Sequence, residues 1–343
     1  MQQVTFRLVF KGRLDFGNER TFEKVRQHWQ SRMENYFKNH LLFKAEEALR
    51  LEDYALVIPQ QKLHGSDKAW RMTVELFREL AQYATAGYIA AWCLGDEGTA
   101  EQTYIEPVSD KVAVQEFLRG RQLVNVPGKE MEAAQALSRA IEKYERHALA
   151  YERRGYVNYK LGNYNDALHD FERSISFNPH HPDAYYGRGK VRMIKNDWSG
   201  AAEDFDLTIK NSIALQPIYW SARLRKGECL LHLKKYAEAC KELKLFLGRN
   251  FDRSDPNYRH LRRATYLLGK ALLGLNDFAA AIEAFDRALS IQNVEDRRSE
   301  MESLLHRAIA KQQMGQPEFT GDLLIAAQMG CVEAARLLDA WRS

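Results

Sequence analysis

The sequence has little cysteine and no paired cysteine motif. Its 343 residues include four cysteines, and none of them stands in a CxxC spacing: Cys93, Cys229, Cys240 and Cys331. A few scattered cysteines exclude a disulfide framework and are typical of reduced, buried residues in a cytoplasmic protein. The sequence therefore predicts a cytoplasmic location and a fold that does not depend on disulfide bonds.

Long apolar runs and a strong charge of one sign are also missing. No stretch of about 18 apolar residues occurs, which argues against a membrane-spanning helix, and the start of the chain does not resemble a signal peptide. The net charge is +4, and residues 1–110 hold 14 basic against 16 acidic residues, so the basic excess belongs to the rest of the chain. This mild excess favours an acidic protein partner over nucleic acid, which requires a concentrated basic stripe.

Motifs for catalysis, cofactors and metals are absent as well. The glycines at 95 and 98 and the Gly128-Lys129 pair both lack the spacing of a phosphate-binding loop. His180 and His181 stand between prolines without further ligands, so we interpret them as exposed turn residues. The sequence therefore predicts a protein without catalytic residues, cofactor or metal.

A pattern that repeats 34 residues apart is the strongest positive signal. Six residues of one segment recur in the next: Tyr151, Gly155, Tyr164, Ala167, Phe171 and Ile175, then Tyr185, Gly189, Trp198, Ala201, Phe205 and Ile209. A repeat of this length forms a pair of helices that cannot bury its apolar face alone, so successive pairs must stack. Further copies begin near residues 220 and 262, each after an insertion, and the one near 262 is again a strong match. The pattern predicts a helical solenoid.

These residues resemble the tetratricopeptide repeat family, which favours a small residue at position 8, an aromatic at 17 and alanine at 20. Segment 148–181 supplies Gly155, Tyr164 and Ala167 at these positions. The resemblance implies a solenoid over residues 109–343, with units at 148–181, 182–219, 220–261 and 262–300. A degenerate unit at 114–147 precedes them, and a capping segment at 301–343 ends like a Sel1-like repeat.

Residues 1–108 do not share the pattern and predict a small α/β domain. Alternating apolar residues predict a strand at 4–10, and helical periodicity predicts helices at 20–38 and at 68–85, the second capped by Ser66 or Asp67. Further strands are expected at 54–59, 88–94 and 103–105. Residues 40–51 fit a strand or a helix: a strand gives a ferredoxin-like order, and a helix gives another small α/β sandwich. The predicted fold class is α+β, possibly ferredoxin-like, followed by an all-α solenoid.

The resemblance also implies that the first helix of each unit lines a concave groove. Carried onto this sequence, the aromatic and basic groove residues are Tyr156, Tyr159, Lys160, Tyr186, Lys190, Arg225, Arg263, Tyr266 and Lys270. Glu152, Asp183, Glu228 and His232 share the same face. Tyrosines offer rigid contact area, and lysine and arginine bind carboxylates. We therefore expect a scaffold or adaptor that binds a protein or peptide of acidic character, in a groove that is either open or filled by the chain's own N-terminal domain.

Two other functions were weighed against this expectation, one known for the family and one for the N-terminal domain. The family's clamp for chaperone C-termini needs lysine and asparagine where this chain has Glu152 and Tyr156, so a clamp of that kind is rejected. The alternative function is that residues 1–108 form a small-molecule-binding or enzymatic domain that the repeats regulate.

Overall fold

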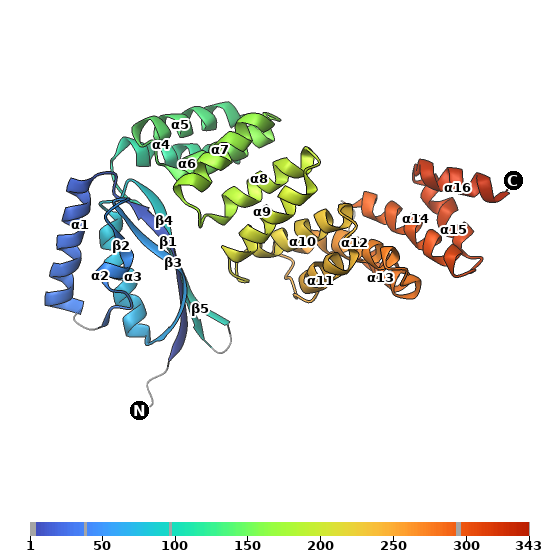
Figure 1. Cartoon of the computed structure of the whole chain (residues 1–343), viewed down its shortest axis with the longest axis horizontal. Helices are drawn as coiled ribbons and strands as arrows, with labels where there is room; N and C mark the ends of the chain where they lie inside the picture. Colours follow the sequence, from blue (N-terminus) through green and yellow to red (C-terminus); the bar gives the residue numbers. More distant parts are fainter. Residues whose placement is uncertain (1–4, 38–39, 96–97, 293–295, 343) are drawn as a thin grey trace. The chain divides into compact units, whose positions relative to one another are not determined.

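The computed structural model describes residues 5–37, 40–95, 98–292 and 296–342. The chain divides into two compact units, residues 1–187 and 188–343. The first contains a five-stranded sheet and the first helix pairs, and the described part of the second contains helices (Figure 1). An α+β region followed by a tetratricopeptide-like solenoid is the fold class that the sequence predicts.

The sheet belongs to the split βαβ type. Its elements are β1 (Phe6–Asp15), α1 (Glu19–Arg32), α2 (Ala45–Ala48), β2 (Leu49–Arg50), β3 (Ala55–Gly65), α3 (Asp67–Ala81), β4 (Ala86–Gly95) and β5 (Gly98–Ile105). The strand order is β2-β3-β1-β4-β5, and all neighbours are antiparallel. Because β1 is antiparallel to both β3 and β4, these two strands are parallel to each other, are connected through α3 and are separated by β1. The ferredoxin-like alternative is the one that this order matches.

The boundaries differ from the prediction where the sequence was ambiguous. Residues 40–51 contain both predicted types, the short helix α2 and the two-residue strand β2. Strand β3 runs to Gly65, well past the predicted end at residue 59, and α3 ends at Ala81 because the chain must turn into β4. The predicted cap is confirmed: the Ser66 hydroxyl accepts a hydrogen bond from the Ala69 amide at 3.2 Å.

Helices α1 and α3 lie on the same side of the sheet (Figure 1). Leu8, Phe10 and Leu14 of β1 point toward them and are fully buried together with Trp29 and Phe77. The rings of Phe10 and Phe77 meet edge to face at 6.2 Å. One face of the sheet is therefore closed by the helices of its own domain.

The remaining helices form antiparallel pairs, in which we call the first helix A and the second B. The pairs are α4 (Val112–Leu123) with α5 (Glu130–Lys143), α6 (Ala148–Lys160) with α7 (Tyr164–Phe177), α8 (Pro182–Ile194) with α9 (Trp198–Lys210), α10 (Pro217–His232) with α11 (Tyr236–Leu247), and α12 (Leu261–Gly274) with α13 (Phe278–Ser290). They are followed by α14 (Arg297–Gln313), α15 (Phe319–Gln328) and α16 (Val332–Arg342). In the second unit α12 packs against both α10 and α14, so successive A helices lie beside one another.

Glycines permit the close approach of the A and B helices, as the repeat pattern predicts. A Cβ atom on Gly155 would lie 3.0 Å from the ring of Phe171, and one on Gly269 would lie 2.5 Å from the ring of Phe285. In the degenerate first pair, Gly120 takes this role one residue before the predicted position, facing Leu137 at 2.6 Å. The helices therefore pack at a distance that leaves little or no room for a larger side chain.

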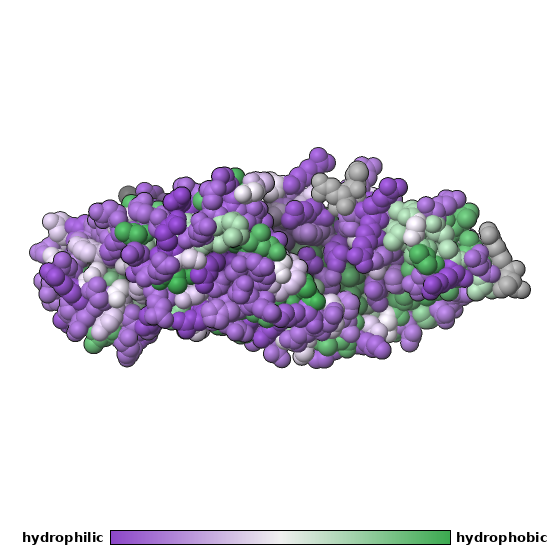
Figure 2. Space-filling model, turned by 90° about the horizontal axis from the view of Figure 1, so that it is seen from above, coloured by the Kyte–Doolittle hydropathy of each residue, from purple (hydrophilic) through white to green (hydrophobic). Residues whose placement is uncertain are grey.

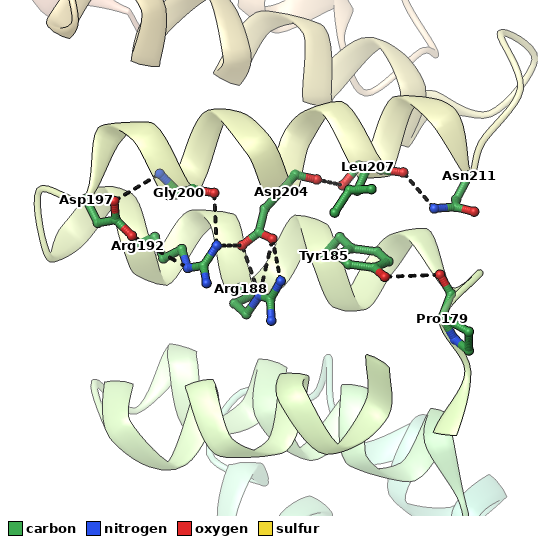
Figure 3. Close-up of polar contacts among 10 residues, drawn as sticks. Pro179, Tyr185, Arg188, Arg192, Asp197, Gly200, Asp204, Leu207 and Asn211 are labelled. Atoms are coloured by element: carbon green, nitrogen blue, oxygen red, sulfur yellow. Dashed lines mark hydrogen bonds and ion pairs between the residues drawn. The ribbon is translucent and has the colours of Figure 1, made fainter. Parts of the chain in front are cut away.

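A recurring ion pair also ties helix A to helix B. Arg154 binds Asp170 at 2.7 Å, and 34 residues later Arg188 binds Asp204 at 2.7 Å. Figure 3 shows Arg188 and Arg192 converging on Asp204, whose side chain is 1% exposed. Both members of this pair recur at the repeat distance of 34 residues, a signal in the sequence that could have predicted it.

The later repeats keep or replace this pair. Lys226 binds Glu242 at 3.0 Å within its own repeat and Asp206 of the preceding B helix at 2.9 Å, so that one cation bridges three helices. In the fourth repeat, which α12 and α13 form, the equivalent positions carry Leu268 and Ala284, and both pack in the apolar core. The repeat frame thus tolerates either a buried ion pair or an apolar contact at the same place.

Candidate binding surface

The repeat at residues 148–181, formed by α6 and α7 and called the first repeat here, is covered by the five-stranded sheet of the same unit. The second face of the sheet presents Val9, Lys11, Arg13 and Asp15 of β1 and Tyr88 and Trp92 of β4. The four β1 side chains are at most 8% exposed, although α1 and α3 lie on the opposite face. Tyr88 packs against a cluster of buried residues from α4, α5 and α6, and its ring lies 6.5 Å from that of His181. The inner surface of this repeat is therefore occupied within the first unit.

The covered surface is charged as well as buried. Asp53 binds both Arg13, at 3.1 Å, and Arg146 of the α5–α6 connection, at 2.5 Å. Burial lowers the pKa of Lys11 to about 8, a shift that the negative charge of Asp183 partly opposes. The contact between sheet and repeat therefore rests on ionic pairs and not on apolar packing alone.

The prediction that His180 and His181 are both exposed turn residues is wrong for His181. His180 is exposed, as expected of a turn residue, but His181 is 3% exposed. It lies between the carboxylates of Glu152, at 3.8 Å, and Asp183, at 3.9 Å, beneath Tyr88. The sequence suggested an exposed residue because the docking of the sheet on this repeat is a long-range contact that a local pattern does not reveal.

The predicted groove residues of the first unit are mostly engaged within it. Tyr156 is half-buried against the cluster of α4, α5 and α6, and the ring of Tyr159 lies 6.1 Å from that of Tyr164. Lys160 donates a hydrogen bond to the Val124 carbonyl at 3.1 Å, so it points to the α4–α5 connection. Tyr186 is half-buried on α8.

The second unit holds the predicted cations on adjacent A helices. Arg225 of α10 donates from Nη1 to Glu228 Oε2 at 3.0 Å, and Arg263 of α12 donates from Nη2 to Glu228 Oε1. Glu228 therefore joins two A helices by one carboxylate. Lys270 lies two turns beyond Arg263 on α12, 5.8 Å from the centre of the Tyr266 ring.

Tyr266 supports this surface from beneath. Its side chain is 3% exposed and packs 5.6 Å from the ring of His306 and 6.2 Å from that of Phe285. Burial raises the pKa of its hydroxyl, and the negative charge of Glu302 adds to the shift. The residue therefore cannot act as the exposed contact that the repeat position suggested.

Three members of the surface were not among the predicted contact residues. Glu228 was placed on the face but given no role, and Arg298 and Glu302 come from α14, where the repeat pattern is weak. Burial would raise the pKa of Glu302, but hydrogen bonds from Arg298 and Tyr266 outweigh burial and lower it. We call the resulting set the A-helix face: Lys190, Arg225, Arg263, Lys270 and Arg298, with Glu228 and Glu302.

The A-helix face is electropositive. Burial lowers the pKa of Lys190 to about 8, and the charge of Arg225 adds to the shift. Burial also lowers the pKa of His260 to about 4, together with the charges of Arg225 and Arg259. Burial is the larger cause of both shifts, and the charges of the neighbouring arginines add a repulsion of further positive charge. These arginine charges would attract a negative charge placed on the surface.

Apolar side chains do not distinguish this surface. The view in Figure 2 is mostly hydrophilic, and hydrophobic residues gather at the end that carries the last helices. The exposed apolar residues of that end are Leu324, Ile325, Val332 and Trp341. The A-helix face as defined above consists of charged residues, so recognition there would depend on charge and hydrogen bonds.

Comparison with known proteins agrees with the repeat geometry. Family models described as tetratricopeptide repeat match residues 148–181 and 263–294. The chain therefore contains tetratricopeptide repeats. The Sel1-like character of its closing segment stays a prediction. A comparison with curated protein sequences gives no match.

Solved tetratricopeptide structures resemble the chain in fold. YrrB, described as a TPR protein with an unusual peptide-binding site, is 17% identical with a TM-score of 0.50, over 61% of this chain and 100% of YrrB. PilF of Pseudomonas aeruginosa is 14% identical with a TM-score of 0.52, over 67% of this chain and 98% of PilF. At such identities the likeness establishes the fold and leaves the ligand open.

Two other kinds of feature are absent from the described residues. Within the described residues, no group of three or more histidine, cysteine, aspartate or glutamate side chains is arranged to hold a metal ion. Across the same ranges, no helix has the length and apolar character needed to cross a membrane.

Proposed function

We propose that this tetratricopeptide-repeat protein is a non-catalytic interaction scaffold whose A-helix face binds an acidic segment of a protein or peptide partner. The observation that carries the proposal is the composition of that face, where five cations lie among two carboxylates on neighbouring helices. Arginine and lysine bind carboxylates by charge-assisted hydrogen bonds. The arginine charges that add to burial in lowering the pKa values of Lys190 and His260 support an anionic ligand, because they repel cations and attract anions.

The alternative, a ligand-binding or enzymatic N-terminal domain, has less support. One face of its sheet is filled by aromatic and aliphatic side chains, and the β1 residues of the other face are buried. A cavity between the sheet and α4, lined by Gly87, Phe117 and His147 among others, measures about 10 Å³, which is about the space of one water molecule. RNA binding on the sheet is disfavoured as well, because Trp92 is buried.

The proposal is tested by affinity capture from the native host. The full chain and a triple variant, Lys190→Ala/Arg225→Ala/Arg263→Ala, are used as baits, and the captured proteins are identified by mass spectrometry. We expect the wild type to enrich partners through acidic segments and the variant to lose most of that recovery, about tenfold or more, since each lost ionic hydrogen bond weakens binding severalfold.

A matched triple variant controls for net charge. Lys241→Ala/Lys244→Ala/Arg287→Ala removes the same number of cations from exposed positions of the B helices α11 and α13. It should retain wild-type recovery. Equal recovery by wild type and both variants would contradict the assignment of the A-helix face, and equal loss in both would show a nonspecific charge effect.

A further inference from the structure

Glu228 occupies an unusual position for a carboxylate on a cationic binding surface. Its two oxygens serve different partners: Oε2 accepts from Arg225 on its own helix, and Oε1 accepts from Arg263 on the next A helix. Its side chain is 11% exposed, while those of Arg225 and Arg263 are 29% and 32% exposed. The carboxylate of a ligand that approached from solvent would contact Arg225 and Arg263 at the site that Glu228 occupies.

Not every hydrogen-bond donor of the Arg263 guanidinium has a partner. Its Nη2 donates to Glu228, but its Nε is buried and has no hydrogen-bond partner among the described residues. Nε and Nη2 form the edge of the guanidinium that binds a carboxylate through two parallel hydrogen bonds. One half of this edge is satisfied internally, and the other half is an unpaired buried donor, which is costly.

We propose that Glu228 is an internal stand-in for a ligand carboxylate, and that an acidic side chain of a peptide partner replaces it on the Nε–Nη2 edge of Arg263. This inference rests on the proposed function and names its recognition chemistry. On binding, Glu228 releases Arg263 and keeps its bond to Arg225, so it is not left as an unpaired buried charge. Arg263 exchanges one internal hydrogen bond for two with the ligand.

The arrangement makes Glu228 a residue that sets the strength and selectivity of binding. The carboxylate holds Arg263 in place while no ligand is bound, and it lowers affinity because a ligand must compete with it. Neutral or weakly acidic segments would not displace it. Lys190 of α8 and Lys270 of α12, on the A helices that flank α10, would bind a second acidic residue of the ligand.

The experiment measures binding of a fluorescein-labelled hexaglutamate peptide to the full chain by fluorescence anisotropy, with hexaglutamine as the neutral probe. Glu228→Gln keeps the size of the side chain and removes its charge, so it should bind hexaglutamate about three- to tenfold more tightly than the wild type. Arg263→Lys keeps the charge and removes the two-donor edge, so it should bind about tenfold more weakly. Arg225→Lys should have a smaller effect than Arg263→Lys.

Two controls separate this inference from simpler explanations. Glu300→Gln makes the same charge change at a carboxylate that binds Arg262 instead of a member of the A-helix face, and should alter affinity less than twofold. The thermal stability of each variant is measured to establish that it is folded. Unchanged or weaker binding by Glu228→Gln would overturn the inference, as would equal binding by Arg263→Lys and the wild type.

The outcomes also separate the inference from the proposed function. If the wild type prefers hexaglutamate to hexaglutamine but Glu228→Gln does not bind more tightly, the stand-in role fails and the acidic partner stands. If no variant prefers the acidic peptide, both fail.

Discussion

The first and fourth repeats have the same frame and different inner surfaces. Family models match both, at residues 148–181 and 263–294, and each places a glycine against a phenylalanine ring. In the first repeat the inner surface includes Glu152, which is 4% exposed within a unit where the sheet covers α6. In the fourth repeat the equivalent position carries Tyr266, which is buried as well, whereas Arg263 and Lys270 of the same helix are half-buried and belong to the A-helix face.

This difference shows that the repeat pattern determines how helix A packs on helix B, while the residues of the inner surface can vary. The small and aromatic residues fix how A meets B, and they recur in both repeats. The inner positions are not constrained by that packing, so one repeat has become a docking surface for the chain's own sheet while the other carries cations suited to a partner. The ion pair Arg154–Asp170 and its apolar counterpart Leu268–Ala284 show the same freedom inside the pair.

The largest predicted effect comes from breaking the ion pair of the first repeat. Asp170→Ala removes a buried carboxylate and leaves Arg154 without its main partner, which should destabilise α6 and α7 by about 3–5 kcal/mol. The double variant Arg154→Leu/Asp170→Ala installs the pair of the fourth repeat and should recover most of that loss. Hydrogen exchange of the amides in α6 and α7 measures both. If the double variant is no more stable than the single one, the two repeats are not interchangeable at this position.

A smaller effect concerns Lys11 on the covered face. Its pKa in the folded chain is about 8, below the ordinary value of 10.5, so the folded state carries a cost at pH 7 that disappears as the pH rises from about 8 to 10.5. Lys11→Met should therefore raise stability by about 2–3 kcal/mol at pH 7, and the gain should vanish near pH 10.5. Denaturant unfolding of both proteins at the two pH values gives the difference. A gain that is independent of pH would exclude the titration of Lys11 as its cause.

The smallest expected effect is the difference in stability between alanine substitutions at Gly155 and at Gly269. Gly269→Ala brings a Cβ atom within 2.5 Å of the Phe285 ring and should destabilise the fourth repeat by about 1–2 kcal/mol. Gly155→Ala meets Phe171 at 3.0 Å, a contact that a small shift of the ring relieves, and the higher helix propensity of alanine offsets the cost. We expect it to be nearly neutral. Thermal unfolding of the two variants compares them directly.

The sequence predicted the frame because its signals are local. The spacing of Gly155, Tyr164, Ala167 and Phe171 reflects contacts within one helix pair, and the Ser66 cap reflects contacts within one turn. The length of β3 was underestimated because its second half carries mostly polar residues, which lack the apolar alternation of a strand although they pair with β1.

The surface was less predictable because it depends on contacts between distant segments. Repeat positions placed Arg225 and Arg263 on one face, but nothing in the spacing shows that Glu228 joins them. Lys160 is drawn to Val124 and Tyr266 is buried by α14, and neither contact follows from its position in the repeat. His181 was misjudged for the same reason.

The most direct test compares the chemical reactivity of two lysines with similar pKa values. Burial lowers the pKa of both Lys11 and Lys190 to about 8, but Lys11 is 5% exposed beneath the first repeat and Lys190 is half-buried on the A-helix face. Residue-resolved acylation at pH 8, with and without hexaglutamate, measures both. We predict that Lys190 reacts quickly and is protected by the peptide, whereas Lys11 reacts slowly in either case. Equal reactivity of the two lysines, or protection of neither, would contradict the division into a covered and a ligand-binding repeat surface.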